Sequence, residues 1–447
     1  MNPVGATLTV IFSIMVVVMP RRWAALALMA GVCYITQGQQ VIVMGFHFTA
    51  IRIILLAGVL RILIRGDLKQ VKLNKIDWAL VLFAASSSIL SSIRVGTSEE
   101  LNYQTGFAYN TLFSYFVFRG LVRNLDDFRA FLEGMALLII PLALCMVDEA
   151  QTGMSLFNFM GGRDEIVDWD RGGRFRCVGS FRGPHTAGTF GATFFPLLSA
   201  LFFATGRRPL AIVGVIASTT IAYTANASGP LSALVSGWIG LAFWPLRTDM
   251  RRVRKGIVVF LVVYALLSKA PVWFIFAKIS NVMGGDGWTR SYVLQSCFNH
   301  FFDWWLMGTS NTDGWAMINT AWGGADITDQ FVSSACQGGL LALGSLIAIL
   351  VWCYSNIGSC VRITRDVSPE TEKLFWCLGS ALFAHTIALF SVTYFDQMHV
   401  PWWGLLAMIS GVTSDFLHRA TELKTNEEPC DSTPELGVLE EETFPSA

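Results

Sequence analysis

The chain has 447 residues, of which 53% are hydrophobic and only 14% are charged. Soluble globular proteins carry about 25% charged residues, so this composition excludes an ordinary soluble domain and, with a mean hydropathy of +0.52, indicates a polytopic protein of the lipid bilayer. The 32 basic and 32 acidic residues cancel, which excludes a strongly basic nucleic-acid-binding protein.

The apolar segments predict the architecture. A helix needs about 20 mostly apolar residues to cross a bilayer, and thirteen segments approach this length, although the first two are short. We therefore predict an all-α fold, a polytopic transmembrane helical bundle of 12 to 13 spans. In chain order the predicted spans are 4–19, 23–37, 47–64, 77–93, 105–121, 129–147, 186–204, 209–224, 230–246, 256–276, 330–354, 374–394 and 399–416.

The basic residues predict the orientation of these spans. Lys and Arg are enriched in short cytoplasmic loops, and 22 of the 32 fall in alternate connections or just after the last span. The intervening short connections, such as 97–105 and 225–229, contain almost none. We assign the basic connections to the cytoplasm; they include Arg21, Arg22, Arg61, Arg65, Arg119, Arg123, Arg207, Arg208, Arg247, Arg251, Arg362 and Arg365.

Two long connections, 148–185 and 277–329, fall on the extracytoplasmic side of this topology. Loops of this length are usually functional or disordered. Because the two loops together are rich in Trp, Gly, Asp and Arg, we predict ordered loops that contain short or interfacial helices. They belong to one transmembrane domain, 1–418, and the acidic segment 419–447 is predicted to be a disordered cytoplasmic tail.

The first outer loop places arginines on the side where the orientation rule disfavours them. A guanidinium group binds phosphate oxygens in bidentate fashion, and lipid pyrophosphates and headgroups are the phosphate-rich ligands outside the cytoplasm. Arg163 and Arg171 lie among acidic residues and are interpreted as paired with them. Three arginines that follow the acidic cluster are stronger phosphate-binding candidates: Arg174, Arg176 and Arg182.

Motifs for metal or nucleotide chemistry are weak or absent. Asp168-Trp169-Asp170 matches the short DxD pattern, but this tripeptide often arises by chance and nucleotide sugars are not expected outside, so no metal site is predicted. The patterns GxxxxGK[ST], GxSxG and HExxH do not occur. Their absence argues against an ATP-driven pump and against a serine hydrolase.

In the second outer loop, Arg290 opens a stretch that alternates apolar and polar residues up to Phe302. This pattern predicts an amphipathic helix that lies in the membrane interface. His300 falls on that helix, where it is either a functional group or a residue that simply lies at headgroup level.

Two motifs occur in a fixed order. The first is Arg176-Cys-Val-Gly-Ser-Phe-Arg-Gly-Pro-His-Thr-Ala-Gly188, and the second is Arg290 followed by Gly308 and then by Gln-Gly-Gly339 at the start of a span. Together they resemble the O-antigen ligase and O-antigen polymerase superfamily of membrane glycosyltransferases, whose first motif reads R-x-x-G-x-F-x-x-P-N-x-x-G. The resemblance covers about 170–350 and the general layout of spans.

The chain departs from the family pattern at two places. His185 stands where the family has Asn after the proline. Ligase members usually carry a His about eleven residues before the later glycine, and here that place is Thr328, with Asp329 beside it. The missing His argues against a ligase and leaves the choice of base open.

The resemblance implies transfer of a glycan from a polyprenyl-pyrophosphate carrier such as undecaprenyl pyrophosphate to an acceptor hydroxyl, on a glycan or a lipid-linked acceptor. The reaction would take place at the outer face of the bacterial inner membrane, without metal or other cofactor. Cations would stabilise the leaving pyrophosphate; the candidates are Arg176, Arg290, Arg182 and Arg174. A carboxylate or imidazole would activate the acceptor; the candidates, in order, are Asp329, His185 and His300.

Three functions remain open at this point. The missing His favours a polymerase of exopolysaccharide or O-antigen repeat units over the alternative, a ligase that transfers the glycan to lipid A-core or protein. A secondary transporter is the second alternative, but the sequence contains no evident internal repeat and few ionisable residues within its spans. Asp329 itself also fits a purely structural role as the N-cap of the following helix.

Overall fold

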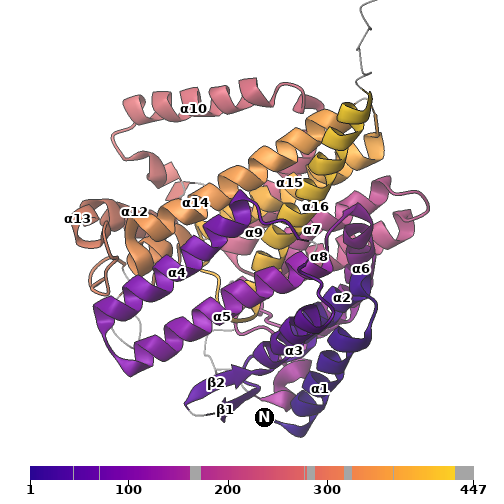
Figure 1. Cartoon of the computed structure of the whole chain (residues 1–447). Coiled ribbons are helices and arrows are strands. Elements are labelled where there is room, and N and C mark those ends of the chain that lie inside the picture. The colour runs from indigo at the N-terminus through magenta and orange to yellow at the C-terminus, as the bar shows by residue number, and fades with distance from the viewer. Residues whose placement is uncertain are drawn as a thin grey trace, which may run out of the picture.

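Helices make up 77% of the described residues and strands 3%, which confirms the predicted helical class (Figure 1). The computed structural model describes residues 1–43, 45–69, 71–161, 173–275, 277–278, 287–316, 325–365 and 367–427. The first predicted outer loop is therefore described except for 162–172, and the second except for 279–286 and 317–324.

The elements follow the predicted spans closely. The N-terminal elements are α1 (Pro3–Val18), α2 (Arg21–Tyr34), β1 (Gln40–Val43), β2 (Phe46–Thr49), α3 (Ala50–Ile64), α4 (Lys75–Val95), α5 (Ser98–Leu121) and α6 (Leu125–Thr152). After the short helix η1 (Leu156–Met160) come α7 (Pro184–Ser199), η2 (Ala200–Phe203), α8 (Arg208–Thr224), α9 (Ser228–Ala242), η3 (Trp244–Leu246), α10 (Met250–Leu267) and η4 (Val272–Phe274). The last are α12 (Gly287–Asn299), α13 (Phe301–Trp304), α14 (Gln330–Thr364), α15 (Pro369–Leu389), η5 (Asp396–Met398) and α16 (His399–Glu427). Every predicted span overlaps one of these helices.

Within the described residues, four helical segments are long and apolar enough to cross a membrane: Lys75–Val95, Leu125–Thr152, Pro184–Phe203 and Gln330–Thr364. The third of these, α7 with η2, is the central one, because 89% of its apolar stretch is buried while the others are at most half buried. Glycine permits this packing. A Cβ atom added at Gly191 would lie 2.6 Å from the carbonyl oxygen of Ser218 in α8, so a larger residue would force the two helices apart.

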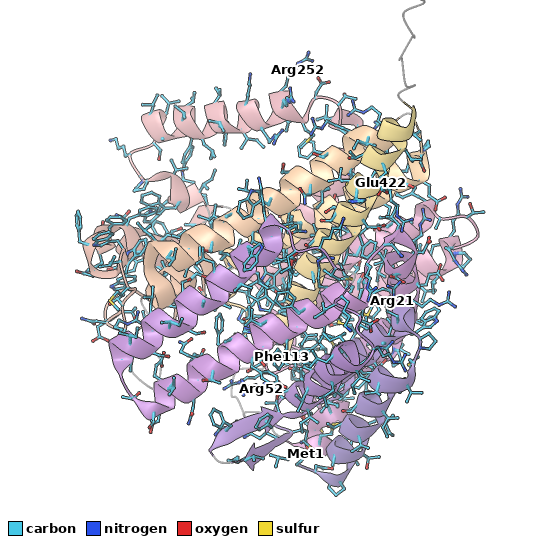
Figure 2. The ribbon with its side chains drawn as sticks, viewed as in Figure 1. Met1, Arg21, Arg52, Phe113, Arg252 and Glu422 are labelled. Atoms are coloured by element: carbon cyan, nitrogen blue, oxygen red, sulfur yellow. The ribbon has the colours of Figure 1, made fainter. Side chains whose placement is uncertain are left out.

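The predicted basic connections meet at one end of the bundle, where they form ion pairs. In Figure 2, Arg21 and Glu422 lie toward this end, whereas Met1 and Arg52 lie toward the other. The ion pairs that join different connections include Arg21–Asp127 at 2.8 Å, Arg207–Glu133 at 2.8 Å, Arg247–Glu372 at 2.8 Å and Arg129–Glu370 at 3.1 Å. We call the opposite end the site face; α7, α9, α14 and α16 begin there, and α8 and α15 end there.

The sequence prediction missed a β-hairpin on the site face. Strands β1 and β2 pair antiparallel, with Gln40 opposite Thr49 and Val43 opposite Phe46. The predicted topology instead places this segment in a short connection and at the start of the span 47–64. Two runs of β-branched and aromatic residues around Gly45, whose φ is +82°, instead favour strands joined by a tight turn.

The second predicted outer loop contains the expected short helices. α12 begins three residues before Arg290, and α13 follows it and ends at Trp304. Val293 and Cys297 are buried, and they pack in a small separate core with the first turns of α14. Phe298 and Phe302 are exposed, whereas Trp304 is buried in the same small core.

Helix α10 stands apart from the bundle (Figure 1). It has no buried residue, and its apolar side chains are exposed; Leu266, for example, is 80% exposed. Because so much apolar surface is unfavourable in water, this helix requires a lipid or protein surrounding.

The C-terminal boundary differs from the expectation. Helix α16 continues to Glu427, so the helix extends past position 419, where the tail was predicted to begin. Residues 428–447, which contain most of the acidic tail, lie outside the described residues.

Candidate functional site

The first motif forms a loop that a buried carboxylate holds in place. Glu149, near the end of α6, is 4% exposed, and its two carboxylate oxygens accept the backbone N–H groups of Val178 at 3.0 Å and Gly179 at 2.9 Å. Gly179 has a φ of +57°, a conformation that favours glycine. Phe181 is fully buried. The motif glycine and phenylalanine therefore fix the backbone between Arg176 and α7.

Arg176 and His185 contact each other directly. A guanidinium nitrogen (Nη2) of Arg176 lies 3.1 Å from Nε2 of His185. Because arginine only donates hydrogen bonds, Nε2 is the acceptor and the imidazole is neutral, with its proton on Nδ1. The structure thus brings two predicted site residues together, and it assigns Nε2 of His185 to the arginine rather than to an acceptor hydroxyl.

The other two candidates in this loop have different surroundings. The guanidinium of Arg174 lies 4.2 Å from the ring centre of Tyr223, at the end of α8. Arg182 donates to the carboxylate of Asp396 at 3.2 Å. Arg174 is thus positioned by an aromatic ring, and Arg182 by an acid from the other end of the chain.

Asp329 occupies a buried position at the start of α14. Its side chain is 0% exposed, and Oδ1 accepts the N–H groups of Phe331 at 2.8 Å and Val332 at 3.0 Å. The predicted N-cap is therefore present. Within the described part of the chain, the second oxygen, Oδ2, accepts no hydrogen bond.

The electrostatic state of Asp329 follows from this position. Burial raises the pKa of its carboxyl to about 7, although the two backbone N–H groups and the charge of Arg290 act in the opposite direction. Arg290 lies on α12 and donates to Ser228 Oγ at 3.3 Å. A carboxyl with this pKa exchanges its proton near neutral pH.

His300, the third catalytic candidate, directly follows α12. Nδ1 of its ring donates to the carbonyl of Ser296 at 2.9 Å, and the ring stacks on Trp315 with centres 5.2 Å apart. The side chain is exposed at the edge of the small core of α12 and α14. These contacts associate His300 with the α12 surface and not with the Arg176–His185 pair.

Two short connections join the parts of the site. In the α8–α9 connection, Asn226 donates a hydrogen bond to the carbonyl of Arg174 at 3.0 Å. Ser228, the first residue of α9, accepts a hydrogen bond from Arg290. In the connection 390–398, the hydroxyl of Thr393 donates to the carbonyl of Ile327 at 2.7 Å. The loop of Arg176 and the segment of Asp329 are therefore both attached to the site face.

Sequence reasoning missed a clamp at a kink in α14. The helix loses helical geometry at Gly338 and Gly339, and the loop after α13 packs its backbone into the gap. The N–H of Thr309 donates to the carbonyl of Cys336 at 2.9 Å, and the N–H of Leu340 to that of Trp305 at 2.8 Å. In the sequence, the pair Gly338-Gly339 within an apolar run is the one feature that indicates this kink.

Arg94, at the end of α4, closes this clamp. Its guanidinium donates to the carbonyl of Met307 at 2.5 Å and to that of Gln337 at 3.3 Å. Gly308 has a φ of +77°, and a Cβ there would lie 2.1 Å from the carbonyl oxygen of Cys336. The glycines of the second motif thus permit the close backbone contact that orients α14 beneath Asp329.

Some predicted groups lie outside the described residues. They are Arg163, Arg171 and the acidic cluster that contains Asp168 and Asp170. In the ranges that are described, no three His, Cys, Asp or Glu side chains are grouped to hold a metal ion.

No protein-family model and no curated protein sequence matches the chain. The chemistry of the site must therefore be inferred from its own residues. They provide a buried carboxyl that titrates near neutrality beside one arginine, and a second arginine paired with a neutral imidazole.

Proposed function

We propose that the protein is a membrane glycosyltransferase of surface polysaccharide assembly in the bacterial cytoplasmic membrane. It transfers a glycan from a polyprenyl-pyrophosphate carrier to an acceptor hydroxyl and polymerises repeat units of exopolysaccharide or O-antigen. The observation that carries the proposal is Asp329. One of its oxygens caps α14, and the other is buried without a described donor beside the charge of Arg290.

The acceptor side of the reaction uses this second oxygen. Oδ2 of ionised Asp329 takes the proton of the acceptor hydroxyl while the hydroxyl oxygen forms a bond to the anomeric carbon of the donor sugar. The bond between that carbon and the pyrophosphate oxygen breaks, and its electron pair leaves with the lipid pyrophosphate. A base with a pKa near the working pH is suited to this role.

The donor side requires positive charge where the pyrophosphate leaves. Arg176 and Arg290 provide it, and Arg174 lies in the same loop as Arg176. Helices α7 and α9 also begin at the site face, and the partial positive charge at a helix N-terminus favours anions. These cations stabilise the departing pyrophosphate more than the bound ground state, which is the condition for a faster reaction.

The topology is part of the proposal. We assign the ion-paired end of the bundle to the cytoplasm, because its connections hold most of the Lys and Arg residues, and the site face to the extracytoplasmic side. The thirteen helices that overlap the predicted segments would supply the 12 to 13 spans, with the C-terminal tail inside. A lipid-linked donor could then reach the site from the outer leaflet.

The test is an assay with purified protein in proteoliposomes and undecaprenyl-pyrophosphate-linked oligosaccharide as the only substrate. Formation of a ladder of longer lipid-linked glycans supports a polymerase. Transfer that occurs only after lipid A-core is added supports the ligase alternative instead. No transfer with either acceptor, from a folded protein, contradicts the proposal.

A matched pair of variants links the activity to the site. Asp329→Asn keeps the cap but removes the base, so we expect polymer formation to be lost. Asp313→Asn, an exposed aspartate in the same connection, should leave activity unchanged.

A further inference from the structure

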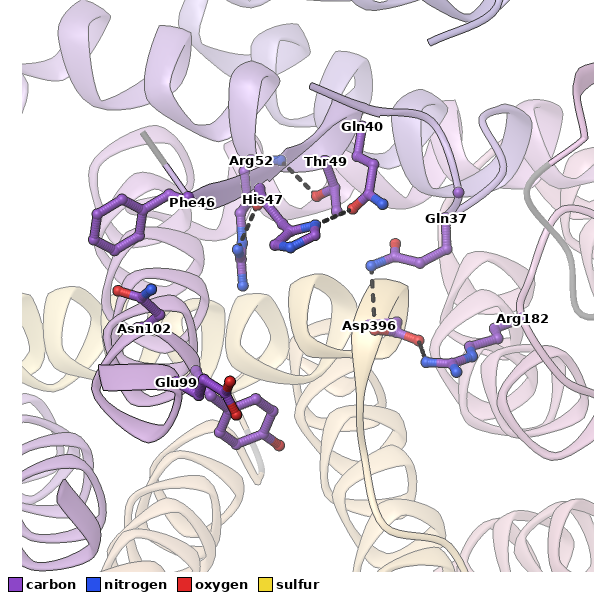
Figure 3. Close-up of a pocket in the computed structure, with 13 residues that line it drawn as sticks. Gln37, Gln40, Phe46, His47, Thr49, Arg52, Glu99, Asn102, Arg182 and Asp396 are labelled. Carbon is purple, nitrogen blue, oxygen red and sulfur yellow. Dashed lines mark hydrogen bonds and ion pairs between the residues drawn. The ribbon is translucent and has the colours of Figure 1, made fainter. Parts of the chain in front are cut away.

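The site face contains a pocket of about 710 Å³ that the mechanism above does not use (Figure 3). Its walls come from the β1–β2 hairpin, the first turns of α3 and α5, the loop of Arg182 and the residue Asp396 in η5. This volume falls in the usual range of small-molecule sites.

The lining of the pocket is polar and electrically balanced. Among the described lining residues, Arg52 and Arg182 carry positive charge, and Glu99 and Asp396 carry negative charge. Amide side chains add both donors and acceptors; they are Gln37, Gln40 and Asn102. A pyrophosphate site would need an excess of cations, which this pocket does not have.

Hydrogen bonds hold part of the wall in place. Asp396 accepts from Gln37 at 3.1 Å and from Arg182 at 3.2 Å, as the dashed lines in Figure 3 show. Arg52 donates to the carbonyl of His47 at 2.6 Å and to Asn110 at 3.0 Å. These contacts fix the two arginines and the acid before any ligand binds, which lowers the entropy cost of binding.

Aromatic rings complete the lining. Phe46 and Tyr103 both line the pocket, and Tyr103 is 63% exposed. The flat aromatic rings can pack on a ligand face made of carbon–hydrogen groups. The amides, carboxylates and guanidinium groups beside them can bind hydroxyl groups on the ligand's edges. Hydroxyl groups both donate and accept hydrogen bonds, so they can use each polar group in this lining.

The pocket lies close to the proposed reacting groups along two segments. Tyr394 donates its N–H to Gln330, the neighbour of Asp329, at 2.8 Å, and Asp396 is two residues further along the chain. Two residues span at most about 7 Å. Arg182 is three residues from His185 in the loop of the first motif. A glycan that reacts at Asp329 could therefore extend into the pocket.

We infer that this pocket binds uncharged sugar of the glycan substrate, next to the reacting end. The inference rests on the proposed function, because it takes the substrate to be a glycan. It assigns recognition of the sugar to the hairpin, α5 and Asp396, and recognition of the pyrophosphate to Arg176 and Arg290.

Two probes separate these assignments in the full-length protein in nanodiscs. One is the lipid-free oligosaccharide released from the donor by mild acid, and the other is undecaprenyl pyrophosphate without sugar. Asn102→Leu and the nearly isosteric Glu99→Gln should each weaken binding of the oligosaccharide about tenfold, through the loss of one or two polar contacts. Both should bind undecaprenyl pyrophosphate as the wild type does. Gln151→Leu, an exposed amide at the end of α6, is the control.

The possible outcomes are distinct. Unchanged oligosaccharide binding in both pocket variants, or no binding by the wild type, overturns the inference even if the enzyme is active. If Arg176→Ala and Arg290→Ala both bind undecaprenyl pyrophosphate normally, the pyrophosphate assignment of the proposed function fails instead. Weaker binding of both probes by the pocket variants, with Gln151→Leu unchanged, overturns the division of roles between the two sites.

Discussion

In the proposed mechanism, Asp329 combines two tasks that are usually assigned to different residues. Its Oδ1 satisfies two N–H groups of the first turn of α14, and we propose that its Oδ2 is the base. We predict that Asp329→Asn lowers the transfer rate about 10²- to 10⁴-fold, the usual contribution of a general base. The free energy of unfolding should change little, because Asn caps about as well as Asp. Rates in proteoliposomes and thermal unfolding in detergent measure both effects, and full activity would leave Asp329 as a cap alone.

The pH dependence of the rate tests the same residue. The pKa of the Asp329 carboxyl is raised by burial to about 7, so the base is largely protonated, and inactive, at lower pH. We expect the rate to rise about tenfold per pH unit at acidic pH and to level off above about 7. A rate that stays constant from pH 5 to 8 would contradict the assignment.

Substitutions at Arg176 and Arg290 test whether these arginines stabilise the leaving pyrophosphate of the donor. Arg176→Lys keeps the charge but loses the bidentate fork, so its rate should fall, and Arg176→Ala and Arg290→Ala should fall further. A lost contact of this kind removes about 2–4 kcal/mol of transition-state stabilisation, or about 30- to 1000-fold in rate. Arg208→Ala, an exposed arginine at the start of α8, should have the activity of the wild type. Near-normal polymer formation in both site alanine variants would refute the role.

At the scale of elements, the kink of α14 is the feature on which the position of Asp329 depends. Gly339 has a φ of +61°, and a Cβ there would lie 2.7 Å from the carbonyl oxygen of Leu306. We predict that Gly339→Ala destabilises the protein by about 1–3 kcal/mol and reduces activity. Gly344→Ala, five residues further along α14, meets no atom within 4 Å and should be neutral or slightly stabilising. Equal thermal stability of the two variants would argue against the clamp.

The elements also differ in how readily the sequence predicts them. The helices follow apolar runs, and caps such as the Asn74–Asp77 capping box of α4 mark their ends. The β-hairpin was missed because its strands are only four residues long and β2 directly adjoins the apolar helix α3. The kink was missed because one turn of distorted geometry at a glycine pair leaves the hydrophobic pattern of α14 unchanged.

For the whole molecule, the critical prediction is the side of the membrane on which each end of the helical bundle lies. Asp313→Cys on the site face should react with an impermeant maleimide added to intact cells. Arg208→Cys at the ion-paired end should react only after the membrane is permeabilised. The described native cysteines are buried or partly buried, which keeps the background labelling low. The reverse pattern would invert the topology and remove the basis for an extracytoplasmic reaction.

The sequence by itself determined the helical class, the position of nearly every helix and the grouping of the basic connections at one end. These properties depend on composition and on neighbours a few residues apart, so they can be read along the chain. It also singled out Arg176, Arg290 and Asp329 as candidates, without showing which of them share a site.

Only the tertiary structure decided those relations. It paired Arg176 with His185, stacked His300 on Trp315, and showed that one oxygen of Asp329 caps a helix while the other is buried without a described donor. It also built a polar pocket from the hairpin, α5, Arg182 and Asp396. These residues are up to 359 positions apart along the chain, as in the contact of Gln37 with Asp396. Which residues meet across such a distance depends on how whole helices pack, and no local pattern encodes it.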